Sequence, residues 1–177
     1  MRPSNLPTFC AIALAALACR QSTAAPPPSP YEPLKFLIGH CWKGTFPGSE
    51  RTDEHCFSWM YGGKFVRDEH VVRGGDGHEL QSGESIYLWD AASAQLEYLY
   101  VESSGGYCRG AVSPQKDALV FPPALYVDPQ SGEARNIRSR WQRTADDVYE
   151  VATEFEVRDG WGPGFKARMQ RVKDASR

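Results

Sequence analysis

Glycine turns fix how the strands near the start of this chain pair, and that pairing constrains the fold more than any other feature. Gly62 and Gly63 separate two alternating, aromatic-rich runs, residues 53–60 and 65–72. Such a pattern is typical of a β-hairpin with a two-residue turn of type I′. The two runs are therefore predicted to form an antiparallel pair whose register is set by the turn.

The tripeptide Asp-Glu-His occurs in both runs, at residues 53–55 and 68–70. The hairpin register sets His55 opposite His70, and a second turn at 47–50 pairs an upstream strand with the first run. Because successive side chains of a strand point to opposite faces, one face collects a mixed set. Its members are His40, Trp42, His55, Phe57, Trp59, Val66, Asp68 and His70. We expect this more apolar face to point inward and to surround a cavity.

The same register makes a prediction about the cysteines. It sets Cys41 opposite Cys56, on the face away from the histidines, and this predicts a disulfide between them. Cys108 then stays free. Its neighbour Arg109 allows an alternative role as a reactive thiol of lowered pKa, but no histidine lies nearby in sequence to act as a base. We favour an unreactive thiol.

The N-terminus has the features of an export signal. Residues 1–24 combine the positive charge of Arg2 with an apolar stretch, 9–19, and a small residue, Ala24, at the cleavage position. An alternative is a lipoprotein signal in which Cys19 becomes the lipidated first residue. Both interpretations predict an exported protein that is periplasmic, secreted or anchored in the envelope by lipid.

Charge and length bound the rest of the chain. Cleavage after Ala24 leaves 18 basic and 22 acidic side chains, a net charge of −4, which gives no support to a nucleic-acid partner. No later stretch is apolar enough for a transmembrane helix. Residues 25–33 are predicted to be a proline-rich tether, and residues 34–173 have the length of one domain.

Short alternating segments separated by turn residues continue to the C-terminus. We expect strands at about 40–46, 53–60, 65–73, 84–90, 95–102, 107–113, 118–122, 135–143, 148–157 and 164–172. A short helical turn within 31–37 would close one end, and the glycine-rich segment 160–164 is predicted to be a turn. This pattern predicts an all-β fold, a single antiparallel up-and-down barrel of about ten strands.

Four aromatic motifs support this architecture: Trp42-Lys43-Gly44-Thr45-Phe46, Trp59-Met60-Tyr61-Gly62-Gly63-Lys64-Phe65, Tyr87-Leu88-Trp89-Asp90 and Trp141-Gln142-Arg143-Thr144. With them the chain resembles a family of bacterial exported proteins of unassigned function with a lipocalin-like, calycin-type barrel. The resemblance implies a barrel over most of residues 34–172 and attaches no catalytic role to the motifs. Nitrobindin, a haem-binding ten-stranded barrel, is similar at a greater distance, but its haem-ligating histidine has no matching position here.

We expect the barrel to bind a small apolar or amphipathic molecule without catalysis. The predicted ligand-binding residues combine aromatic walls with polar anchors: Trp42, His55, Phe57, Trp59, Asp68 and His70. No nucleophile or oxyanion motif accompanies them, so an enzyme is the less favoured interpretation. The sequence does not identify the ligand.

Two alternatives stay open for the inward histidines. His40, His55 and His70, or Asp68 in place of the first, are suitable ligands for zinc or copper, and this alternative includes haem. The other alternative is a structural envelope protein whose barrel is filled by its own side chains and binds no ligand.

Overall fold

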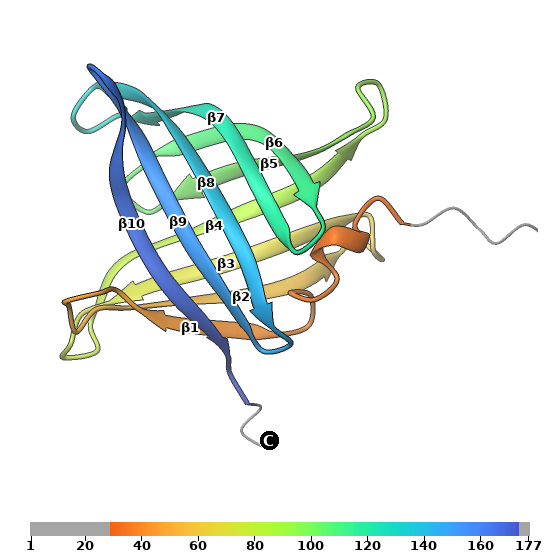
Figure 1. The fold of residues 1–177 in the computed structure, drawn as a ribbon, viewed down its shortest axis with the longest axis horizontal. Coiled ribbons are helices and arrows are strands. Elements are labelled where there is room, and N and C mark those ends of the chain that lie inside the picture. The colour runs from red at the N-terminus through yellow and green to blue at the C-terminus, as the bar shows by residue number, and fades with distance from the viewer. Residues whose placement is uncertain (1–28, 174–177) are drawn as a thin grey trace, which may run out of the picture.

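The computed structural model describes residues 29–173, and within them ten strands form a closed antiparallel barrel (Figure 1). Each strand pairs with its sequence neighbours, and the first strand closes the barrel against the last. The strands are β1 (Cys41–Thr45), β2 (Thr52–Met60), β3 (Phe65–Arg73), β4 (Glu79–Asp90), β5 (Gln95–Glu102), β6 (Tyr107–Gln115), β7 (Ala118–Asp128), β8 (Glu133–Ala145), β9 (Val148–Val157) and β10 (Gly160–Arg171). The predicted up-and-down barrel is confirmed.

The register of the first three strands is the predicted one. His55 of β2 lies opposite His70 of β3, and Cys41 of β1 lies opposite Cys56. Alternation along these strands therefore does bring both histidines to the inner face of the barrel.

The turn that joins β2 to β3 differs from the prediction. The last strand pair is Met60 with Phe65, so the connection is a four-residue loop and not a two-residue turn. Tyr61, Gly62 and Gly63 all have positive φ angles, of 48°, 67° and 87°. Glycine adopts this backbone region without a steric penalty, which is why the two glycines stand here. Because the loop extends symmetrically beyond the predicted turn, the register is unchanged.

The last strand also differs from the prediction. The prediction of a turn at 160–164 is wrong, because β10 already begins at Gly160. Its pairing with β9 is interrupted between Pro163 and Lys166, where the register shifts. Proline has no N–H to give to a ladder, and a β-bulge accommodates it without ending the strand. A Gly-Pro-Gly segment therefore marks a bulge here.

A short 3-10 turn, η1 (Glu32–Leu34), precedes the barrel as expected. Leu34 and Leu37 are fully buried, and the indole Nε1 of Trp42 donates to the carbonyl of Leu37 over 3.4 Å. The Trp42 ring packs edge-on against Tyr149, with 5.1 Å between the ring centroids. This N-terminal segment and these aromatic rings fill one end of the barrel. In the described part of the chain, no helix has the length and hydropathy needed to cross a membrane.

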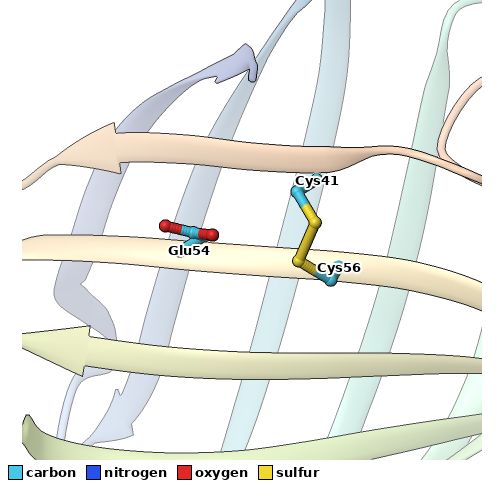
Figure 2. Close-up of side chains that lie close together, drawn as sticks. All are labelled: Cys41, Glu54 and Cys56. Atoms are coloured by element: carbon cyan, nitrogen blue, oxygen red, sulfur yellow. A yellow bond between two sulfur atoms is a disulfide. The ribbon is translucent and has the colours of Figure 1, made fainter. Parts of the chain in front are cut away.

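The predicted disulfide between Cys41 and Cys56 is confirmed (Figure 2). It joins β1 to β2 on the face opposite to His55. The carboxylate of Glu54 lies near the two sulfur atoms on the same face. Metal binding by cysteine requires thiolates, and the disulfide removes them. We therefore assign this group a structural role.

Candidate functional site

The barrel interior contains a cavity of about 340 Å³. Aromatic side chains from β5, β7, β8 and β9 form much of its wall, and ionisable side chains from β2 and β3 form another part. Its lining includes the ionisable residues Asp53, His55, Asp68 and His70 and the aromatic residues Tyr100 and Trp141.

The two Asp-Glu-His tripeptides supply the ionisable part of this wall. Because side chains alternate along a strand, the first and third residue of each copy face inward and the central glutamates face outward. Asp53, Asp68 and His70 are buried, with exposed fractions of 6, 1 and 7 %. The His55 side chain is 15 % exposed. Buried groups of this kind require partners, and the four side chains supply some of them to one another.

His55 lies between two carboxylates. Its Nδ1 is 2.9 Å from Oδ2 and 3.0 Å from Oδ1 of Asp68, and its Nε2 is 3.1 Å from Oδ2 of Asp53. Burial disfavours the charged imidazole, but the charges of Asp68 and Asp53 outweigh it and hold the pKa of His55 well above its ordinary value. Burial likewise opposes ionisation of Asp53, yet the neighbouring imidazoles hold the pKa of its carboxyl well below the usual range. His55 therefore lies between two carboxylates whose charges favour its protonated form.

His70 has a different environment. Its Nε2 is 3.1 Å from the hydroxyl of Tyr100. Its Nδ1 lies 3.5 Å from Oδ1 of Asp53, and within the described residues neither of these two buried atoms has a hydrogen-bond partner. The wall of the cavity thus carries two polar atoms that are available to a third group.

Aromatic contacts fix the two imidazole rings. The rings of His55 and His70 stack with their centroids 5.1 Å apart and an interplanar angle of 18°. Trp141 of β8 meets His55 edge-on at 6.0 Å. The ionisable cluster therefore packs directly against the aromatic wall.

The structure brings some of the predicted site residues to the cavity and not others. His55, Asp68 and His70 line it. Trp42 and Phe57 are buried but lie outside its lining, and Trp42 belongs to the filled end described above. Three aromatic residues of β7, β8 and β9 form walls in their place: Phe121, Trp141 and Phe155.

Trp59 shares the inward parity of β2, yet it lies outside the cavity lining and is 48 % exposed. It stands next to the end of the strand and packs edge-on against Tyr31, with 5.6 Å between the ring centroids. A side chain with inward parity at this end of β2 therefore contacts the segment that precedes the barrel. We therefore exclude Trp59 from the walls of the site.

Asp53 was missed by the sequence analysis, although the same alternation could have found it. It lies two residues before His55 and so shares its face. His40, a predicted metal ligand, does not join the other two histidines. Its Nε2 lies 3.5 Å from Nη1 of Arg171. Asp53 joins His55 and His70 instead, in a group whose donor atoms all lie within 4.8 Å of one another.

Cys108 is the one cysteine of residues 29–173 outside the disulfide. It is buried at the cavity wall, with its sulfur 3.4 Å from the hydroxyl of Tyr98. Burial raises the pKa of its thiol. A raised pKa lowers the thiolate fraction, so the environment does not favour the reactive-thiol alternative.

Comparisons with known proteins bear on the fold. No protein-family model matches this sequence, and the comparison with curated proteins also finds no match. Among solved structures, the barrel is similar to the crystal structure of Rv2717c from M. tuberculosis, with a TM-score of 0.60 and 15 % sequence identity over 81 % of this chain and 98 % of that chain. At this identity the likeness supports the barrel fold and carries no function. The resemblance to lipocalin-like exported proteins stays a prediction.

Proposed function

We propose that the protein binds a small apolar or amphipathic molecule inside the barrel and does not transform it. The observation that carries this proposal is a cavity of about 340 Å³ lined by aromatic side chains. Two buried polar atoms in its lining residues, Oδ1 of Asp53 and Nδ1 of His70, have no hydrogen-bond partner within the described residues. Known ligand pockets have volumes of about 300–1,000 Å³ and combine apolar walls with a few polar groups that orient the ligand. This cavity has both properties.

The polar atoms indicate where such a molecule would be anchored. Nδ1 of His70 and Oδ1 of Asp53 are 3.5 Å apart and can bind the same polar group of a ligand. Phe121, Trp141 and Phe155 would contact its apolar part. The expected ligand is therefore amphipathic, with one polar group at the His70 side of the cavity.

Binding is better supported than acid–base catalysis. A general base needs an accessible ring nitrogen with a pKa near the working pH. Both ring nitrogens of His55 are bonded to carboxylates, and its pKa lies well above the ordinary value. His55 is therefore poorly suited to accept a proton from a substrate.

We extend the proposal to an exported protein. Disulfides persist in oxidising compartments, and the bond between Cys41 and Cys56 supports such a location. The expected signal peptide, residues 1–24, and the alternative lipid attachment at Cys19 lie outside the described residues, as do the first residues of the expected tether, 25–28.

The proposal is tested with 1-anilinonaphthalene-8-sulfonate, an amphipathic aromatic probe that fluoresces in apolar sites. We expect saturable binding of one probe per chain. Ala167 of β10 is 5 % exposed and lines the cavity, so Ala167→Trp would fill the space that the probe occupies. This variant is expected to lose probe binding while it keeps the circular dichroism spectrum of a barrel.

The matched control is Arg168→Trp, which adds the same ring to the neighbouring position of β10, on the outer face. It is expected to bind the probe as the unaltered protein does. Equal binding by the Ala167→Trp variant, or no saturable binding by the unaltered protein, would contradict a ligand-binding cavity.

A further inference from the structure

We propose that Asp53, His55 and His70 form a site for one divalent transition-metal ion of the zinc type. The inference goes beyond the binding of a small molecule, because the ion would be held by the protein's own side chains whether or not an organic ligand enters the cavity. It rests on three observations: the spacing of the donor atoms, the partners of the two imidazoles, and the unpaired atoms between them.

All donor atoms of the group lie within 4.8 Å of one another, and two of their distances are close to those of a coordination shell. Nε2 of His55 is 3.1 Å from Oδ2 of Asp53, and Nδ1 of His70 is 3.5 Å from Oδ1 of the same carboxylate. Zinc binds imidazole nitrogen and carboxylate oxygen at about 2.0–2.2 Å, so neighbouring ligands of a tetrahedral ion lie about 3.3 Å apart. Small side-chain movements would bring all three groups onto one ion.

The partners of the imidazoles direct the correct nitrogens to that ion. A metal-bound histidine usually donates its other ring N–H to a carboxylate, a carbonyl or another polar group. Asp68 accepts at Nδ1 of His55, at 2.9 Å, and the hydroxyl of Tyr100 lies 3.1 Å from Nε2 of His70. Nδ1 of His70 would then coordinate the ion, and so would Nε2 of His55, which would give up its contact with Asp53 and release its proton to solvent as the ion binds.

The third observation points to a group that the protein does not itself supply. Asp53 and His70 each have a side-chain exposure of 8 %, and their facing atoms, Oδ1 and Nδ1, have no hydrogen-bond partner in residues 29–173. Buried polar atoms normally have partners, because leaving them unpaired is unfavourable. A cation between them would satisfy both atoms together with Nε2 of His55.

The site would also leave room for a fourth ligand. All three proposed ligands line the cavity, so an ion bound by them would face its interior. Zinc sites with three protein ligands keep an open position for water or a bound molecule. With the ion bound, the polar group of a cavity ligand would contact the ion at that position, in place of its direct contact with Nδ1 of His70 and Oδ1 of Asp53 in the metal-free cavity.

The competing account is that the cluster is only a buried ion pair, in which His55 is the cation that neutralises Asp53 and Asp68. This account requires no metal, and it treats the 3.5 Å contact between Nδ1 of His70 and Oδ1 of Asp53 as a long ion pair. The two accounts differ in one measurable property, the affinity of the folded protein for a divalent ion.

The test is titration of the full chain, stripped with a chelator, with Zn²⁺ and separately with Co²⁺. We expect one ion per chain by calorimetry and elemental analysis, with visible absorption bands from Co²⁺ bound to nitrogen and oxygen. Asp53→Asn and His70→Ala should each weaken binding by more than about 100-fold, since even the loss of an outer hydrogen-bond partner typically weakens it about 10- to 100-fold. Asp68→Asn, which alters such an outer partner, should weaken ion binding by about 10- to 100-fold.

The matched control is His78→Ala. His78 also contacts an aspartate, Asp76, but the pair lies exposed in the turn between β3 and β4. This variant should bind the ion within twofold of the unaltered protein. Circular dichroism of each variant, with Asp53→Asn as the substitution that preserves side-chain shape, separates loss of ligands from loss of fold.

The inference is overturned if the folded, stripped protein takes up no stoichiometric ion when it is titrated. It is also overturned if His78→Ala weakens ion binding as much as Asp53→Asn and His70→Ala do. The fluorescent probe is measured on the same metal-free sample. Probe binding without metal binding would refute the metal site alone, whereas metal binding without probe binding would refute the small-molecule proposal alone.

Discussion

The two Asp-Glu-His tripeptides are identical in sequence but differ in structure. In the first copy, His55 is bonded through both ring nitrogens to carboxylates. In the second copy, His70 contacts the hydroxyl of Tyr100 and keeps one buried nitrogen without a hydrogen-bond partner. The chemistry of each copy is therefore set by the strands that surround it and not by the tripeptide itself.

The pairing of β2 with β3 places the two copies symmetrically, but the outer neighbours of the two strands differ. His55 and His70 lie opposite each other, so the two aspartates lie on opposite sides of the histidine pair. His55 lies within reach of both. The other neighbour of His70 is β4, where Gly83 is its direct partner. The absence of a side chain there leaves the space that the imidazole of His70 fills.

The largest effect is expected from His55→Ala. Removing this imidazole leaves Asp53 and Asp68 buried without their shared cation, and breaking a buried ion pair typically lowers the free energy of unfolding by about 3–5 kcal/mol. His70→Ala removes fewer contacts and should lower it by about 1–2 kcal/mol. Urea unfolding of the metal-free proteins measures both values. Equal losses would mean that the two copies are equivalent after all.

The disulfide adds a second asymmetry, because only the strand of the first copy is covalently tied to a neighbour. Replacing both Cys41 and Cys56 by serine opens a loop with a sequence separation of 15 residues. The free energy of unfolding should fall by about 3 kcal/mol. Chemical denaturation of this variant, with the reduced unaltered protein as control, checks the value. If the variant has the same denaturation midpoint as the oxidised unaltered protein, the disulfide has no stabilising role.

Gly83→Ala should disturb the second copy selectively. A Cβ at this position would lie 2.7 Å from Nε2 of His70 and 2.6 Å from the carbonyl oxygen of Val101, so the neighbours must move. We expect a loss of about 1–3 kcal/mol in unfolding free energy. The NMR signals of the His70 ring should shift while those of His55 change less.

The control for Gly83→Ala is Ser82→Ala, on the outward face of the same strand. It should leave the ring signals of both histidines in place. Equal shifts at His55 and His70 in the Gly83→Ala protein would show that the two copies respond as one unit.

The smallest effects are expected at the central glutamates, which face outward. Glu54 lies 3.8 Å from Lys43, and Glu69 lies 3.1 Å from Arg67, both as partly exposed pairs. Such pairs contribute about 0.2–1 kcal/mol. Glu54→Gln and Glu69→Gln should therefore change thermal stability little and by similar amounts. A large loss in either variant would mean that the outer face also distinguishes the copies.

The sequence predicts the part of this site that depends on local patterns. Alternation and turn chemistry within residues 40–73 are sufficient for the register that joins His55 to His70, and for the disulfide. Even the four-residue loop at 61–64 preserves that register. Asp53 was within reach of the same argument, because it shares the parity of His55.

The position of the aromatic walls against the histidines was beyond local patterns. Phe121, Trp141 and Phe155 belong to strands that reach the histidines only because the barrel closes. Turn residues fix neighbouring pairs but carry little information on which strands face each other across the interior. For the same reason, inward parity alone could not separate Trp42, at the filled end, from residues that line the cavity.

The central claim is that the polar cluster lines a ligand-binding cavity, and native mass spectrometry tests it most directly. The full chain is produced in a bacterial host with residues 1–24 in place, isolated from the envelope, and compared with the Ala167→Trp variant. The account predicts a stoichiometric adduct on the unaltered protein, or one formed on addition of the fluorescent probe, and a bare chain for the variant. A bare chain in both proteins, before and after addition of the probe, would contradict it.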